Sequence, residues 1–405
     1  MSVTTAARPS AAAIKPPPAG TDYLARVREF AAPLATVAER IDSERELPPE
    51  IIDGLVERGL FRLLLPASLG GAELLPAQYI PVIEALAKID ASTAWCVNQN
   101  SGCSMTAAYL APEAAREIFG GPRGILAWGP GPGEAHVVPG GYQVTAKWAF
   151  ASGSHHASWL GCHVPIYEAD GKPRLNAEGQ PVVRTMLFPK SSTKFTDIWH
   201  TIGLRGTGSD QYEIKDLFVP EEYSVDVLSR RDLPAREAAL LYRFSSLMLY
   251  AGGFAGVALG IARGTLEAFI ELARVKVARG ARNTMCHNNV IQAQTAQAEA
   301  KLSAARRWLL GSFEDITAAA AKRGHVTIDE RMTVRLASTF AIHQSLEVVD
   351  MLYQAAGATA IFDVQPFERR FRDIHSVAQQ LQGRQQHFET VGQYLLGLEA
   401  DTSWL

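Results

Sequence analysis

The stretch GGYQVTAKWAFASG occupies residues 140–153 and decides how the rest of the chain is interpreted. Its paired glycines are typical of a tight turn, and the tyrosine, valine and threonine that follow favour an extended strand. Side chains alternate between the two faces of a strand, so Trp148, Phe150 and Ser152 are predicted to share one face. Two aromatic rings and a hydroxyl on one face fit a strand that borders a cavity. The alternative is an aromatic pair in the core of a sheet, followed by a turn serine.

The sequence on either side of this stretch falls into three zones. Upstream, apolar residues recur at three- and four-residue steps, which predicts helices. Around the stretch, glycine and proline separate short β-rich runs, which predicts an antiparallel barrel or open sheet. Downstream, the helical period returns in four long segments, which predicts an up-down bundle: 236–279, 286–323, 328–356 and 368–397. We therefore expect an α+β fold with a disordered lead-in (1–21), an N-terminal helical domain (22–120), a central β domain (121–233) and a C-terminal four-helix bundle (234–405).

Composition excludes several classes of function. The chain has 405 residues, 47% of them hydrophobic, and a formal net charge of −3, which gives no basis for a nucleic-acid groove or an anionic membrane as partner. We find no apolar run near the roughly 20 residues that a membrane span needs and no secretory signal, so we expect a cytoplasmic protein. Four cysteines without metal spacing are expected to be free thiols. His155, His156 and His163 lack an acidic third ligand, so we expect no metal.

The order of helices, small sheet and four-helix bundle is that of one large family. Over about residues 22–397 the chain resembles the acyl-CoA dehydrogenase superfamily. Within it, the details look more like the flavin-dependent monooxygenase branch, of the two-component, group D type. Besides 140–153, the resembling motifs are DASTAW (90–95), GLRGTGS (203–209), DLFVP (216–220) and ERRFRDIHSVAQ (368–379).

The resemblance implies that the cavity holds reduced FMN or FAD. Trp148 and Phe150 would then form a flat apolar wall for the flavin ring, and Ser152 would lie at its N5 side. The glycine-rich loop 127–135 would lie along flavin and substrate, although a simple strand connection explains it as well.

The loop GLRGTGS supplies further hydrogen-bond donors. Arg205, Thr207 and Ser209 could meet the flavin or an anionic substrate group, with a plain surface turn as the alternative.

The resemblance also implies contacts between subunits. Arg282, which with Asn283 is expected to begin a helix, would pair with the cofactor's phosphates across an interface, unless it is an ordinary surface arginine. Gln354 and Gly357 resemble an element that meets the cofactor of a neighbouring subunit. Together these contacts imply a homotetramer.

The chemistry depends on the last helical segment. A dehydrogenase needs a carboxylate base beside the flavin, and Asp363 or Glu368 does not match the family's spacing. Relatives in the oxygenase branch place a histidine donor where this chain has Gln380, while His375 lies one turn earlier. On one helix these two would point about 140° apart. We favour His375 narrowly because only imidazole titrates near pH 7, and both remain open.

A substrate pocket is expected beside the flavin. Trp95, Asn98 and Trp128 would line it, together with Gln99 and Ser101, although Trp95 also suits a packed helical core. The sequence has no dinucleotide-binding fingerprint, so reduced flavin would come from a separate NAD(P)H:flavin reductase. We therefore expect the oxygenase component of a two-component monooxygenase that hydroxylates a small aromatic or heteroaromatic substrate with O₂. An acyl-CoA dehydrogenase or related flavin oxidase is the alternative, and a catalytically silent flavin-fold binding protein is a third.

Overall fold

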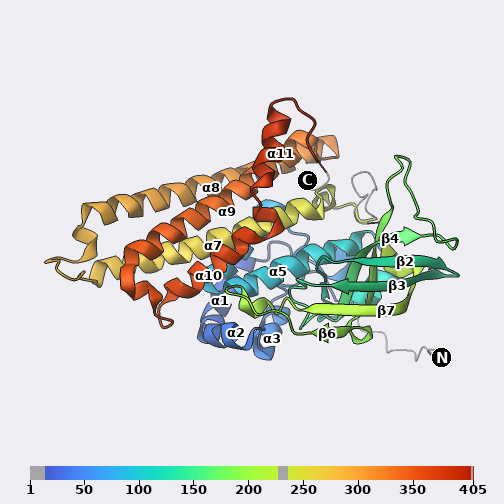
Figure 1. Cartoon of the computed structure of the whole chain (residues 1–405), viewed down its shortest axis with the longest axis horizontal. Helices are drawn as coiled ribbons and strands as arrows, with labels where there is room; N and C mark the ends of the chain where they lie inside the picture. The colour runs from blue at the N-terminus through green and yellow to red at the C-terminus, as the bar shows by residue number, and fades with distance from the viewer. Residues whose placement is uncertain (1–13, 227–235, 403–404) are drawn as a thin grey trace.

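The N-terminal third of the chain is helical, as expected (Figure 1). The computed structural model describes residues 14–226, 236–402 and 405. The Asp22 carboxylate caps the first helix and the Asp90 carboxylate caps the fifth, while Pro49 opens the third at a position where proline costs little. The helices are α1 (Tyr23–Thr36), α2 (Ala38–Glu44), α3 (Pro49–Glu57), α4 (Pro76–Ile89), α5 (Ala91–Ser104) and α6 (Pro112–Phe119). Most of the expected lead-in, residues 1–13, and the expected boundary at 233/234 lie outside the described residues.

The central zone is a sheet in the order β6-β7-β3-β2-β4-β5-β8, with β1 beside β4. Most pairs are antiparallel, as expected, while β2 and β1 each pair with β4 in parallel. The β2–β3 turn uses Gly140 at φ 82°, where glycine avoids strain. The strands are β1 (Leu126–Ala127), β2 (Gly133–Val138), β3 (Gly141–Trp148), β4 (Trp159–Tyr167), β5 (Val183–Pro189), β6 (Lys194–Thr196), β7 (Gln211–Pro220) and β8 (Ser224–Val225).

Four long helices follow, and α7, α8, α9 and α10 run side by side in Figure 1. Gly324 ends the second of them at φ 91°, and a capping box of Thr327 and Glu330 begins the third. The last predicted segment is broken: a helix ends at Gln379, a 3₁₀ turn follows at Leu381–Gly383, and a further short helix begins at Gln386. The helices are α7 (Ser246–Val275), α8 (Asn289–Arg323), α9 (Ile328–Ala356), α10 (Pro366–Gln379) and α11 (Gln386–Leu395).

Helix α7 is the central helix of the bundle. No membrane span was expected from the sequence, yet by length and composition this helix could cross a membrane. However, 89% of its most apolar window is buried within the fold. It packs on α4, α9 and α10, so its apolar surface is covered by protein.

Helix α5 connects the two halves of the molecule. It contacts α4, α7 and strand β1, and within it Gln99 alone is not buried. Its polar side chains therefore need partners inside the protein. Asn98 bonds to the Tyr79 hydroxyl (2.7 Å), and Asn100 donates to the Leu126 carbonyl (3.0 Å). These bonds fix the helix between sheet and bundle.

Candidate active-site cleft

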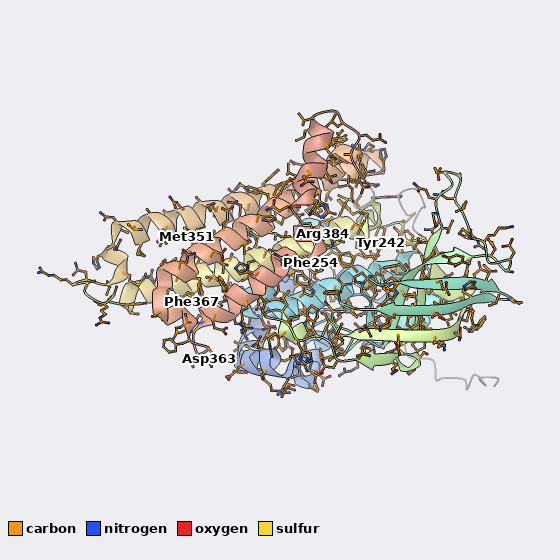
Figure 2. All side chains as sticks on the ribbon, in the orientation of Figure 1. Tyr242, Phe254, Met351, Asp363, Phe367 and Arg384 are labelled. Carbon is orange, nitrogen blue, oxygen red and sulfur yellow. The ribbon has the colours of Figure 1, made fainter. Side chains whose placement is uncertain are left out.

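A cleft of about 2120 Å³ lies where the sheet, α5, α7 and α10 meet. Tyr242, Phe254 and Arg384 all line it, and Figure 2 shows them together at this junction. Polar and aromatic side chains both line it, and the aromatic ones include Trp95, Trp128, Trp148, Phe150, Trp199, Tyr250, Phe254 and Phe371. These aromatic surfaces suit a flat ring system.

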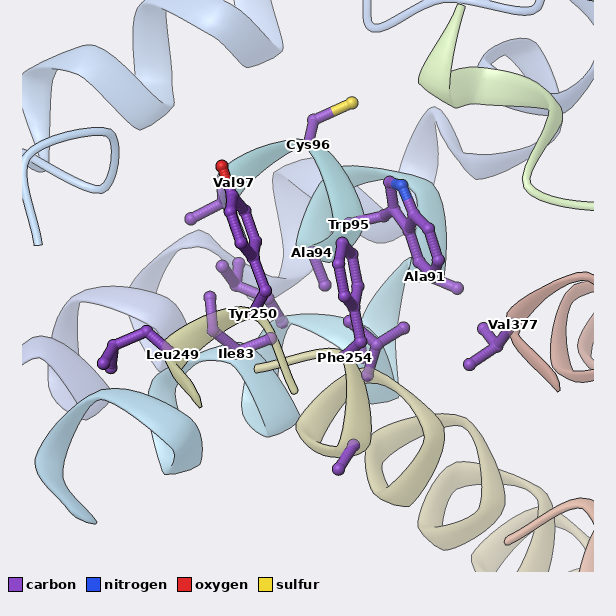
Figure 3. Close-up of a cluster of buried hydrophobic side chains, with 14 of the residues drawn as sticks. Ile83, Ala91, Ala94, Trp95, Cys96, Val97, Leu249, Tyr250, Phe254 and Val377 are labelled. Carbon is purple, nitrogen blue, oxygen red and sulfur yellow. The ribbon is translucent and has the colours of Figure 1, made fainter. Parts of the chain in front are cut away.

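Between α5 and α7 the aromatic wall is tightly packed. The rings of Trp95 and Phe254 lie 4.1 Å apart between centroids, and Tyr250 stacks on Phe254 at 6.0 Å. Figure 3 shows these three rings side by side. Tyr250 and Phe254 were not among the predicted site residues, although their four-residue spacing on one helix could have identified them. Gln99 closes the other side by donating to the Trp128 carbonyl at 3.2 Å.

The stretch 140–153 was expected to continue as a strand as far as Ser152, but it does not. Strand β3 ends at Trp148, and Phe150 takes a left-handed backbone conformation at φ 55°, which is strained for an aromatic residue. Trp148 is buried, whereas Phe150 is 61% exposed and packs edge-on against Trp199. All three predicted residues line the cleft nevertheless. His155 and His156 lie on the following turn, not on a strand.

Ser152 is held by hydrogen bonds on two sides. The Trp95 indole N–H donates to its Oγ at 3.0 Å, and the Ser209 hydroxyl lies 2.6 Å from it. Ser209 is in turn 2.7 Å from the Thr207 hydroxyl, which donates to the Leu204 carbonyl at 2.8 Å. Thr207 thus reaches the cleft only through this chain, because it does not itself line the cavity.

Two further predicted residues lie away from the cleft. The Arg205 guanidinium donates to the Asp42 carbonyl at 3.0 Å and to the Thr201 carbonyl at 3.2 Å. Asn98 is committed to Tyr79 and does not line the cavity. Both side chains hold the fold around the cleft.

His375 and Gln380 both line the cleft. The expected 140° separation does not apply, because α10 ends before Gln380. His375 Nε2 lies 3.0 Å from Asp350 Oδ1. The Gln380 side-chain oxygen accepts from the Gln382 backbone N–H at 2.7 Å, and its amide nitrogen has no hydrogen-bond partner among the described residues.

His163 also lines the cleft, between two tryptophans. Its ring lies 5.0 Å from Trp128 and 5.5 Å from Trp148, both edge-on, and Nδ1 is 2.5 Å from the Thr185 hydroxyl. No group of three or more histidine, cysteine or carboxylate side chains suited to a metal occurs in the part of the chain that the structure describes. The four cysteines are free thiols, as expected.

The remaining candidates lie outside the cleft in the single chain. Arg282 is exposed in the α7–α8 connection rather than at the start of a helix, which begins only at Asn289. Gln354 and Gly357 are exposed at the end of α9. Asp363 lies nearby, and Figure 2 shows it far from Phe254 and the cleft.

Burial shifts the pKa values of two groups near the cleft. It raises the pKa of Asp373, which accepts from the Leu204 backbone N–H at 2.6 Å, to about 7. It lowers the pKa of His156, whose Nε2 lies 3.0 Å from the Asn100 side-chain oxygen, to about 3. Neither group lines the cleft.

Comparison with known proteins gives matches over most of the chain. A family model described as the acyl-CoA dehydrogenase N-terminal domain matches residues 20–119, and one described as the C-terminal domain matches residues 252–384. The chain is 28% identical to an indole-3-acetate monooxygenase of Acinetobacter baumannii, over 84% of this chain and 85% of the relative. It is also 28% identical to the oxygenase component of an FADH(2)-dependent resorcinol hydroxylase of Rhizobium sp., over 92% and 94%.

Solved structures agree with these relatives. A 3-HSA hydroxylase from Rhodococcus sp. RHA1 superposes with a TM-score of 0.87 at 25% identity, covering 95% of this chain and 99% of that one. XiaF from Streptomyces sp., in complex with FADH2 and glycerol, gives a TM-score of 0.86 at 25% identity, over 94% and 96%.

Proposed function

This chain belongs to the acyl-CoA dehydrogenase superfamily, and from that membership we propose that it is the oxygenase component of a two-component, flavin-dependent monooxygenase. It takes reduced flavin from a separate NAD(P)H:flavin reductase and uses O₂ to hydroxylate a small aromatic or heteroaromatic substrate. The observation that carries the proposal is the aromatic cleft closed around the Ser152 hydroxyl.

The residues of the cleft fit a flavin. The Trp148 indole nitrogen is buried without a hydrogen-bond partner among the described residues, which leaves a donor unused beside the cavity. Trp148 and Phe150 provide the wall for the ring, and Ser152 provides a hydroxyl at its edge. When bound, reduced flavin supplies the electrons that activate O₂ for insertion of one oxygen atom.

The protein's own part is to exclude water and to place hydrogen bonds. The aromatic rings of Trp95, Trp128 and Phe254 surround the space beside Ser152, so a substrate ring there is held away from solvent. The Gln380 amide, which also lines the cleft, offers a further donor. No step requires a carboxylate base, and the two candidates for one lie elsewhere: Asp363 is exposed, and Glu368 bonds to Arg372 at 2.7 Å.

One pair of assays separates this proposal from dehydrogenation. The protein is mixed anaerobically with reduced FMN or FAD and a set of phenols and indoles, then exposed to ¹⁸O₂. We expect product that carries one labelled oxygen atom. Bleaching of oxidised flavin by an acyl-CoA, with no labelled aromatic product, would instead identify a dehydrogenase or oxidase.

We further propose that the enzyme is a cytoplasmic homotetramer, in which Arg282 reaches the flavin phosphates across a subunit interface and Gln354 and Gly357 meet the cofactor of a neighbouring subunit. Their exposure in the single chain supports this, as does the exposure of Ile361 (64%) and Phe362 (57%) in the same region. Light scattering of the wild type and of Phe362→Ser should give a tetramer and smaller species respectively. A monomeric wild type at micromolar concentration would rule the assembly out.

We further propose that the chain divides into a helical domain at 22–120, a β domain at 121–233 and a bundle at 234–405. The order of the described elements supports it: helix α6 ends at Phe119, the strands run from Leu126 to Val225, and helix α7 begins at Ser246.

A further inference from the structure

The hydroxyls beside the cleft have one arrangement of protons that satisfies every contact. Four contacts run from the Trp95 indole through Ser152, Ser209 and Thr207 to the Leu204 carbonyl. The first group is only a donor and the last is only an acceptor. Thr207 must therefore donate to Leu204, Ser209 to Thr207, and Ser152 to Ser209. Any other arrangement loses a hydrogen bond.

The two ends of this chain are firmly held. The Leu204 carbonyl also accepts from the Trp199 indole at 3.0 Å, and the Leu204 backbone N–H donates to the Asp373 carboxyl group. At the other end Trp95 is packed on Phe254. The two middle residues, Ser209 and Thr207, are 1% and 2% exposed, so water does not compete for their hydroxyls.

The consequence for Ser152 is that its proton points away from the cleft. Its oxygen accepts from Trp95 and has one acceptor position left, and the residue lines the cavity. Towards a ligand, Ser152 is therefore a hydrogen-bond acceptor and not a donor. A ligand atom beside it has to carry a hydrogen.

Reduced and oxidised flavin differ in this respect. Reduction adds a hydrogen to ring nitrogen N5, which changes that atom from an acceptor to a donor. We propose that Ser209 and Thr207 are positioning residues that keep Ser152 an acceptor, and so make the cleft prefer reduced over oxidised flavin. The inference rests on the proposed function, and it explains how the spent cofactor is released for exchange with the reductase.

The test compares two substitutions at one position. Thr207→Val keeps the shape of the side chain and removes the hydroxyl, so Ser209 is free to donate to Ser152 and the Ser152 proton can turn to the cleft. Thr207→Ser keeps the hydroxyl and serves as the control. Dissociation constants for oxidised and reduced FMN and FAD are measured by anaerobic titration, without turnover. The dissociation constant for oxidised flavin divided by that for reduced flavin should fall about fivefold in Thr207→Val, because one hydrogen bond is worth about 1 kcal/mol. In Thr207→Ser this ratio should stay at the wild-type value.

The same change is measurable as a potential. A fivefold fall in this ratio corresponds to a shift of about 20 mV downward in the two-electron potential of bound flavin, since a tenfold change is about 30 mV. Ser209→Ala should give the same direction of shift, and it replaces Thr207→Val if that variant does not fold. Equal ratios of the dissociation constants in wild type and in the variant lacking a hydroxyl would overturn the inference without contradicting the proposed monooxygenase function. A wild type that binds neither form of flavin would instead overturn the proposed function.

Discussion

Nε2 of His375 on helix α10 lies 3.0 Å from Oδ1 of Asp350 on helix α9, so this imidazole is tied to the bundle rather than free in the cleft. The Gln380 amide, one residue beyond the end of the helix, has no such partner among the described residues. The two candidates that the sequence left open therefore differ in what they can offer a ligand.

We predict that Gln380, not His375, supplies the hydrogen bond from this side of the cleft. Gln380→Ala should lower the yield of hydroxylated product per reduced flavin about fivefold, because one hydrogen bond of about 1 kcal/mol is lost. His375→Asn should retain most of the yield, since it keeps a donor facing Asp350. Loss of product in His375→Asn, with Gln380→Ala fully active, would give the role to the His375 imidazole instead.

Removing the Ser152 hydroxyl should uncouple the reaction. In Ser152→Ala we expect more H₂O₂ and less hydroxylated product per O₂ consumed, by about fivefold, because the acceptor at the edge of the cleft is gone. Ser154→Ala is the matched control, since the Ser154 hydroxyl is buried without a hydrogen-bond partner among the described residues. Identical coupling in the two variants would show that the position of the Ser152 hydroxyl is irrelevant to the chemistry.

Trp148 is predicted to carry part of the flavin affinity. Trp148→Phe should weaken binding of reduced flavin by about 1 kcal/mol, roughly fivefold, because the larger indole surface is lost. Trp159→Phe provides the comparison: Trp159 is also buried, but it stacks on Tyr223 and does not line the cleft. Equal affinities for the two variants in anaerobic titration would place Trp148 in the structural core.

Asp373 should make the protein less stable as pH rises. Burial raises its pKa from 3.8 to about 7, so between these values the folded chain holds a proton that the unfolded chain has lost. The free energy of unfolding therefore falls as pH rises through this window. Asp373→Asn should flatten the fall and stabilise the protein at pH 8 by on the order of 2–4 kcal/mol.

Urea denaturation at pH 5 and pH 8 measures that difference. The exposed Asp363→Asn variant is the control, because its charge is not buried. If Asp373→Asn and wild type lose stability in parallel between the two pH values, the carboxyl of Asp373 is charged throughout and the prediction is wrong.

The parts of the fold that local residues determine could be predicted from the sequence. The Asp90 cap placed helix α5, and residues 328–356 matched helix α9 at both ends because a capping box and glycines fix them. The end of α10 could not be predicted, because the Gln380 side chain bonds to the backbone of Gln382 and replaces the next helical turn.

The residues of the site could likewise be predicted where a local motif identifies them, and not elsewhere. Trp148 and Ser152 were found from a short motif, and both line the cleft. Asn98 was misplaced because its partner, the Tyr79 hydroxyl, comes from another helix, and no local pattern reveals such a contact. The change of direction at Phe150 depends on a strained backbone that the residue type does not suggest.

The pairing of β3 with β7 has a consequence for how the enzyme folds. It aligns Trp148 with Tyr212 and thereby brings together Ser152 and Ser209, which are 57 residues apart in the chain. Such non-local pairs form late and slowly, because a long loop must close first. A slip of one residue in this alignment would turn Trp148 to the opposite face of the sheet. Only molecules whose strands have paired in the correct register can therefore bind the cofactor. Flavin binding thus measures the fraction of correctly folded protein.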